Sequence, residues 1–198
     1  MKTVFVDVDT QIDFLFPAGA LYVSGAERLL PTIAGLNHFA AGHQIPLIST
    51  TDAHTENDPE FRSWPPHCVA GTAGQLKPPE TLLENRSVVR SQAGASFEPA
   101  AQIIVEKQAL DVFTNPNFRA LLARLQAGHY VVYGVATEYC VRCAALGLLD
   151  LGRRVTVVRD AIAAVKPEDG ARALDEIISR GGVLTTGVTL TSGGNIAN

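Results

Sequence analysis

The stretch YVVYGVATEYCVRCAALGLL, residues 130–149, decides the fold, because a continuous apolar run passes directly into a helical pattern. The run at 130–135 does not alternate between apolar and polar residues, which is typical of a strand buried on both faces of a parallel sheet. Similar runs occur at residues 3–8, 45–50, 102–106, 154–158 and 182–186. The sequence therefore predicts a mostly parallel sheet of roughly six strands.

Helical patterns separate these predicted strands. They cover residues 26–42, 116–127, 138–151 and 168–180. Because strands and helices alternate, we expect a three-layer α/β/α fold of Rossmann-like topology, with helices on both faces of the sheet. Residues 1–198 are expected to form a single domain, since a chain of this length suits one hydrophobic core.

The composition excludes several classes of partner. The chain is 46% apolar, carries a net charge of −4 and has no run of Lys or Arg. We therefore expect a small molecule or another protein as partner, and neither nucleic acid nor a membrane. No uncharged apolar stretch reaches the ~18 residues that a membrane span needs, and the N-terminal segment does not resemble a signal peptide. Three cysteines, an odd number, do not suit a disulfide framework and favour the cytoplasm.

Asp9, Lys107 and Cys140 each follow a predicted strand. Ligands of open α/β sheets bind at the carboxyl ends of the strands. Cys140 lies near the start of a helix, where the helix dipole is expected to lower the pKa of a thiol. A carboxylate beside a lysine can accept the thiol proton and return it to a leaving group. The alternatives are an inert buried cysteine and an Asp9–Lys107 ion pair that only caps the sheet, and Asp7 is a rival to Asp9 on the same strand face.

Cys140 and Cys143 also form a C-x-x-C pair, a pattern found in thiol–disulfide redox proteins. The two intervening residues are Val and Arg, whereas the redox motif usually carries Gly or Pro there. The pair also follows a late strand of the predicted sheet. We therefore favour a nucleophilic Cys140 over a redox pair.

Candidate metal ligands lie in residues 51–100, a long proline-containing span with little periodicity. Asp52 and His54 are separated by one residue, so their side chains share a face of an extended chain. Glu60 and His67 follow in the same span. Two carboxylates and two imidazoles suit one divalent transition metal, Zn²⁺, Fe²⁺ or Mn²⁺. For the D-x-H pattern alone, a solvated loop is the alternative interpretation.

Five motifs follow one another along the chain. They are VDTQIDF (8–14), TTDAHTEND (50–58), WPPHCVAGTAG (64–74), VEKQALDVF (105–113) and GVATEYCVRCAA (134–145). Together they resemble the isochorismatase-like cysteine hydrolases and, among these, the nicotinamidases (pyrazinamidases). The resemblance covers nearly the whole chain and implies the α/β/α fold of that family.

The resemblance assigns roles to individual residues. It implies a catalytic triad of Asp9, Lys107 and Cys140. It also implies a cis peptide bond between Val135 and Ala136, and an oxyanion hole made by the backbone N–H groups of Ala136 and Cys140. The implied metal ligands are Asp52, His54, Glu60 and His67, where Glu60 binds directly or is replaced by water. The implied substrate-binding residues are Phe14, Trp64, Ala136 and Tyr139.

The implied reaction converts nicotinamide to nicotinate and ammonia through a thioester, in NAD salvage. The combination of D-x-H, P-P-H and a nucleophilic cysteine favours this reaction over those of other small-amide hydrolases, such as enzymes for maleamate or for ureido and carbamoyl compounds. A non-catalytic binding member of the fold is a further alternative. The family also implies a homo-oligomer, a dimer or a tetramer. Residues 91–99, SQAGASFEP, form either a lid over the pocket or an ordinary surface loop.

Overall fold

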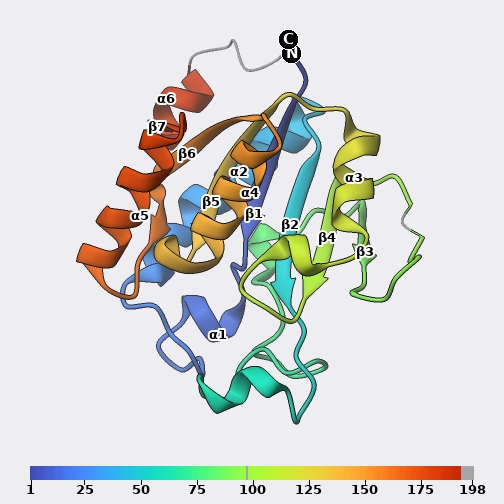
Figure 1. Ribbon diagram of the computed structural model, residues 1–198, viewed down its shortest axis with the longest axis vertical. Coiled ribbons are helices and arrows are strands. Elements are labelled where there is room, and N and C mark those ends of the chain that lie inside the picture. The colour runs from blue at the N-terminus through green and yellow to red at the C-terminus, as the bar shows by residue number, and fades with distance from the viewer. Residues whose placement is uncertain (97, 193–198) are drawn as a thin grey trace.

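A parallel sheet forms the centre of the molecule (Figure 1). The computed structural model describes residues 1–96 and 98–192, and within these ranges the sheet has seven strands. They are β1 (Thr3–Val8), β2 (Leu47–Asp52), β3 (Arg86–Val89), β4 (Gln102–Lys107), β5 (His129–Val135), β6 (Arg154–Ala163) and β7 (Val183–Thr185). Their order is β3-β4-β2-β1-β5-β6-β7, and each neighbouring pair is parallel. The predicted α/β class is confirmed.

Helices cover both faces of this sheet, which gives the predicted three layers. The α-helices are α1 (Ile12–Leu15), α2 (Leu30–Gly42), α3 (Phe118–Leu125), α4 (Arg142–Asp150), α5 (Pro167–Ser179) and α6 (Gly187–Ser192). Helices α2 and α6 pack on the face that contains Phe5. Helices α3, α4 and α5 pack on the opposite face, against Val4 and Val6. Every residue of β1 is buried, because helices cover it from both sides.

The structure differs from the sequence-based expectations at a few elements. Strand β3 is an additional strand, and it went unpredicted because its RSVV sequence is short and partly exposed at the sheet edge. Strand β2 runs to Asp52, two residues beyond the predicted run. The predicted helix at 138–151 begins as a π-helical turn, Thr137–Val141, before α4. Short 3-10 turns occupy Ala26–Leu29, Pro59–Arg62, Pro79–Thr81 and Val112–Thr114.

The carboxyl ends of the strands face the long loop between β2 and β3 (Figure 1). The described residues of the segment 91–99 lie elsewhere, and Gln92 and Gly94 contact Asn117 beside the start of α3. There the side chain of Asn117 accepts a hydrogen bond from the Gly94 N–H and donates one to the Gln92 carbonyl. None of its described residues lines the pocket at the strand ends, and Phe97 lies outside the described residues. No helix in the described ranges is long and apolar enough to cross a membrane.

Candidate active site

Asp9 is the first residue after β1, and its side chain is fully buried. Its backbone adopts a left-handed conformation, with φ of 49°, which is uncommon for a residue other than glycine and is often found at functional sites. The Thr50 hydroxyl donates a hydrogen bond of 2.5 Å to Asp9 Oδ1. Lys107 Nζ lies 2.8 Å from Asp9 Oδ2. The carboxylate is therefore held from both sides at the end of the sheet.

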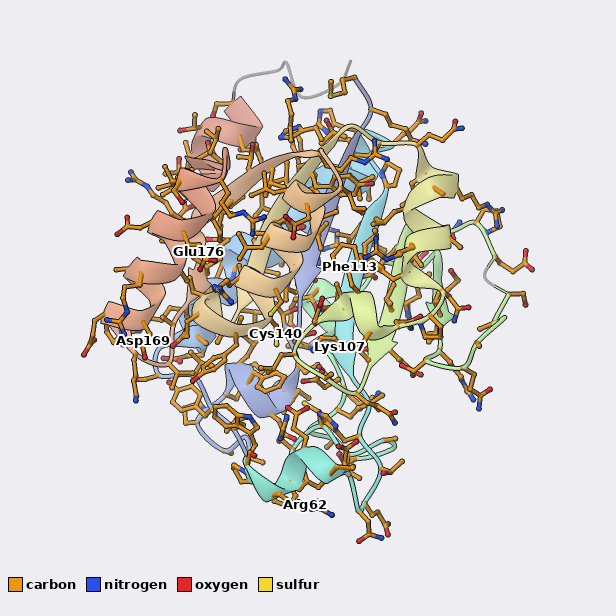
Figure 2. The ribbon with its side chains drawn as sticks, in the orientation of Figure 1. Arg62, Lys107, Phe113, Cys140, Asp169 and Glu176 are labelled. Carbon is orange, nitrogen blue, oxygen red and sulfur yellow. The ribbon has the colours of Figure 1, made fainter. Side chains whose placement is uncertain are left out.

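Lys107 connects three reactive groups. It is the last residue of β4, it is 1% exposed, and its ammonium forms ion pairs with Asp9 and Asp52. Its Nζ also lies 3.6 Å from Cys140 Sγ, and Figure 2 shows the two side chains next to each other. Burial alone would lower the pKa of Lys107, but the carboxylates of Asp52 and Asp9 raise it well above its usual value. Lys107 is therefore charged.

Cys140 is buried in the π-helical turn after β5. The expectation that the helix start lowers the pKa of its thiol is wrong for this structure. Burial raises that pKa well above the ordinary value, and the nearby charge of Lys107 opposes the rise only in part. Burial also raises the pKa of Asp9, against the opposing charge of Lys107. The pair therefore combines a protonated thiol with a carboxylate whose proton affinity is increased.

Asp7, the sequence-level rival of Asp9, belongs to a different cluster. Lys77 Nζ lies 2.9 Å from Asp7 Oδ2, and both side chains are buried. The Asn37 amide donates a second hydrogen bond to the same oxygen, at 3.0 Å. Asp7 therefore pairs with Lys77, deeper in the sheet. Asp9 is the carboxylate that pairs with Lys107, beside the thiol.

The peptide bond between Val135 and Ala136 is cis, as the resemblance implies. Ala136 lies between β5 and the turn that carries Cys140, and both residues line the same pocket. Gly134, just before this bond, has φ of 119°, and a Cβ there would come within 2.0 Å of the Val8 carbonyl oxygen. A glycine is therefore required where β5 packs against Val8 of β1.

Asp52, His54 and His67 form a compact group of potential metal ligands. One ligand atom from each residue lies within 4.8 Å of the others, and all three side chains are buried. Asp52 Oδ2 is 3.8 Å from Nε2 of each histidine. A tetrahedral metal with bonds of about 2.0–2.1 Å separates its ligands by about 3.4 Å, so small side-chain shifts would close the group around an ion.

Local backbone contacts bring the two histidines together. The His54 N–H donates to the Cys68 carbonyl at 3.1 Å, and the Ala70 N–H donates to the His54 carbonyl at 2.9 Å. These bonds form an isolated parallel bridge between His54 and Val69. The loop that contains His67 is therefore paired directly with the extension of β2.

The ring nitrogens of both histidines fit a metal bound through Nε2. His67 Nδ1 forms a hydrogen bond of 2.8 Å with the Pro65 carbonyl, which leaves Nε2 free to face Asp52. His54 Nδ1 lies 3.1 Å from Asp58 Oδ2, and in the described part of the chain neither ring nitrogen of His54 has an aligned hydrogen bond. A buried imidazole nitrogen without a partner, beside a carboxylate and a second imidazole, suits a divalent metal.

Two further acidic residues, Glu60 and Asp58, lie near the group formed by Asp52, His54 and His67. Glu60 is not one of the residues that form it, but it lines the adjacent pocket, and burial raises its pKa. Asp58 was not predicted from the sequence. It lies four residues after His54 and could support that ligand as an outer carboxylate, since ligating histidines commonly donate their second N–H to an acceptor.

A pocket lies between the Cys140 thiol and the group of potential metal ligands, of which Asp52 and His67 line it. Its wall is mainly apolar, as is usual for small-ligand sites. Trp64 and Tyr139 both line it and meet edge to face, with ring centroids 5.3 Å apart. The predicted residues that line it are Phe14, Asp52, Glu60, Trp64, His67, Ala136, Tyr139 and Cys140. The sequence reasoning missed Leu21, Tyr22, Val23 and Val165, which lie outside the five motifs, and Leu110, an apolar residue within VEKQALDVF.

Several known proteins are similar to this chain along most of its length. The chain is 27% identical to the nicotinamidase of Escherichia coli, over 90% of this chain and 92% of that protein. It is 30% identical to the nicotinamidase/pyrazinamidase of Mycobacterium tuberculosis, over 86% and 91%. The crystal structure of the pyrazinamidase of Pyrococcus horikoshii in complex with zinc superposes with a TM-score of 0.79 at 30% identity, covering 94% of this chain and 99% of that one.

The sequence profile of the isochorismatase domain matches residues 3–188. This range includes the three strand ends that carry Asp9, Lys107 and Cys140, together with the loop that carries the histidines. The chain therefore belongs to the isochorismatase family of hydrolases.

Proposed function

We propose that the protein hydrolyses nicotinamide to nicotinate and ammonia, and that it acts in NAD salvage in the cytoplasm. The observation that carries this proposal is a single apolar pocket lined by the Cys140 thiol, by aromatic rings, and by Asp52 and His67 of the metal-ligand group. Nicotinamide has matching parts: a carboxamide for the thiol, and a flat ring whose nitrogen can face a metal. The similarity to nicotinamidases supports the same choice.

In this proposal Asp9 accepts the proton of the Cys140 thiol. The raised pKa of Asp9 makes its carboxylate a better proton acceptor, whereas the raised pKa of Cys140 opposes ionisation of the thiol in the free protein. The proton therefore moves as the sulfur attacks the substrate. The thiolate forms a bond to the carboxamide carbon, and the C–N bond then breaks as Asp9 returns the proton to departing ammonia. Water hydrolyses the resulting thioester with Asp9 as its base. Lys107 keeps the carboxylate ionised in the free protein.

The backbone N–H groups of Ala136 and Cys140 are proposed to stabilise the oxyanion, an effect worth about 3 kcal/mol per donor in hydrolases. Phe14 and Trp64 would hold the ring between them, and Tyr139 would support Trp64 from its edge. Asp52, His54 and His67 would hold the metal, with Glu60 or water as a further ligand. When bound, the metal supplies a Lewis-acidic contact for the ring nitrogen.

The charge of the pocket favours a neutral substrate over an anionic one such as maleamate. Among the described residues that line it, none is Arg or Lys. Lys107 lies behind the thiol, and two carboxylates already pair with its charge. The described part of the pocket wall thus offers an anionic substrate no lysine or arginine to pair with its carboxylate. A ureido or carbamoyl compound remains the second candidate, since it can be neutral.

The test measures ammonia release from nicotinamide by the purified, reduced protein. Activity should be lost on chelation and restored by added metal, and Cys140→Ala should abolish turnover while it still binds nicotinamide. Maleamate and a carbamoyl compound serve as comparison substrates under the same conditions. Unchanged turnover in Cys140→Ala would contradict the nucleophile, and full activity without metal would contradict the metal centre. Preference for a carbamoyl compound would reject nicotinamide as the substrate.

A further inference from the structure

Gln11 lies two residues after Asp9, is fully buried, and is not assigned to the thiol or metal chemistry. Its side-chain amide makes three hydrogen bonds. Nε2 donates to the Asp52 carbonyl at 2.8 Å and to the Gln75 carbonyl at 2.7 Å, and Oε1 accepts from the Asp52 N–H at 2.6 Å. One side chain therefore binds both backbone polar groups of a proposed metal ligand.

These bonds extend the sheet beyond the end of β1. The register between β1 and β2 ends with Val8 opposite Thr50, so the peptide groups of Asp52 face a position where β1 no longer runs. The Gln11 amide carries a donor and an acceptor, as a peptide group does, and occupies that place. Asp52 is thus held on its β1 side by a side chain, whereas on its other side it pairs with Lys107 of β4.

The position of Asp52 affects both halves of the pocket. Its Oδ1 atom pairs with Lys107, while its Oδ2 atom faces Nε2 of His54 and His67. A shift of this backbone would move the carboxylate relative to the histidines and relative to the ammonium beside the thiol. The Gln11 amide is uncharged, so its influence on these groups is one of position.

We propose that Gln11 is a positioning residue, which fixes Asp52 at the correct place to bind the metal. The same side chain also binds the Gln75 carbonyl, and the Ile12 N–H beside it donates to the Leu76 carbonyl at 2.9 Å. Gln11 therefore connects the turn after Asp9 to Gln75 in the long loop between β2 and β3. This inference rests on the metal centre of the proposed function.

The test compares Gln11→Met with a matched control, Asn37→Leu. Both substitutions replace a fully buried amide with an apolar side chain of similar size. The Asn37 amide also makes three hydrogen bonds, with Asp7, the Thr81 carbonyl and the Tyr133 hydroxyl, at 3.0, 2.8 and 2.7 Å. The control therefore loses as many bonds, away from the proposed metal ligands.

The measurements are the Kd for Zn²⁺, by competition with a chromophoric chelator, and the melting temperature. Both variants should melt at lower temperatures than the original protein. Gln11→Met should weaken Zn²⁺ binding by about 10- to 100-fold, the usual effect of removing an outer partner of a ligand. Asn37→Leu should leave the Kd within about threefold of the original value, the scatter expected where no partner of the ligands changes. Equal changes of Kd in the two variants would overturn the proposal.

Gln11→Glu provides a second test if the Met variant does not fold. Glutamate keeps the length and an acceptor for the Asp52 N–H, but it loses the donor to the two carbonyls. Its negative charge would by itself strengthen the binding of a cation, whereas the positioning role predicts weaker binding. An unchanged or stronger Zn²⁺ affinity of this variant would therefore overturn the proposal.

The outcome for the proposed function is separate from this comparison. If the original protein binds Zn²⁺ but releases no ammonia from nicotinamide, the proposed substrate is wrong, and the Kd values of the variants still decide the role of Gln11. If the original protein does not bind Zn²⁺ at all, the metal centre and the role of Gln11 are both overturned.

Discussion

Replacement of Lys107 by methionine tests the electrostatic centre of the site most directly. The substitution removes an ammonium that lies 2.8 Å from Asp9 Oδ2, pairs with Asp52, and lies 3.6 Å from Cys140 Sγ. Lys107, Asp9 and Asp52 are each at most 3% exposed. The variant would therefore leave the two buried carboxylates without the ammonium that they share.

The expected loss of stability follows from that burial. Breaking a buried ion pair by removal of one partner costs about 3–5 kcal/mol, out of a total of about 5–15 kcal/mol for a typical protein. For a chain of this size, 1 kcal/mol corresponds to about 2–4 °C in Tm, so Lys107→Met should lower the Tm by about 6–20 °C. Turnover should fall by at least about 100-fold, because the proton transfer from the thiol loses its charged neighbour.

Lys77→Met is the matched control for this experiment. Lys77 is also buried, and it forms an ion pair of 2.9 Å with a buried carboxylate, Asp7. It should therefore show a similar loss of Tm but retain most of its turnover when assayed well below its melting temperature. Thermal unfolding and ammonia release measure the two effects separately. If Lys107→Met were no less active than Lys77→Met, or no less stable than the original protein, the role given to Lys107 would be refuted.

Three further predictions concern other parts of the pocket. Because burial raises the pKa of Cys140 well above that of an ordinary thiol, its alkylation by iodoacetamide should be slow at pH 7 and rise about tenfold per pH unit through pH 9; a plateau near pH 7 would contradict this. Asp58→Asn should weaken Zn²⁺ binding about tenfold, through its contact with His54 Nδ1, without a large change of Tm; equal Zn²⁺ affinity would show that the contact is incidental. Trp64→Leu should raise the KM for nicotinamide about tenfold with little change of kcat, since the ring supports binding beside Tyr139; a selective loss of kcat would refute a binding role.

Much of the fold could be predicted from the sequence because its strands are continuous apolar runs. Strand β1, with all six residues buried, shows that pattern clearly. Strand β3 does not, since only Val89 of its four residues is buried, and an edge strand of this kind resembles a loop in sequence. The end of β2 was also placed too early, because Thr51 and Asp52 are polar residues buried within the strand. Burial of polar residues follows from their tertiary partners, which periodicity does not show.

Parts of the site could be predicted by the same reasoning. Side chains that follow parallel strands meet at one edge, which correctly brought Asp9, Lys107 and Cys140 together. The pKa of the thiol could not be predicted in this way, because it depends on burial and on the charges that surround it. The contact between Asp58 and His54 was equally out of reach, since it depends on the path of an irregular loop.

The order of the strands explains why the sequence did not show that Asp52 contacts both the lysine and the histidines. D-x-H is a weak pattern by itself, and it predicts at most a metal ligand on a loop. In the structure β2 lies between β1 and β4, and the register places Asp52 directly beside Lys107. One oxygen of Asp52 therefore pairs with the ammonium next to the thiol, while the other faces the two imidazoles. The thiol group and the proposed metal group are thus parts of one connected site, and this connection depends on strand order, which no local motif encodes.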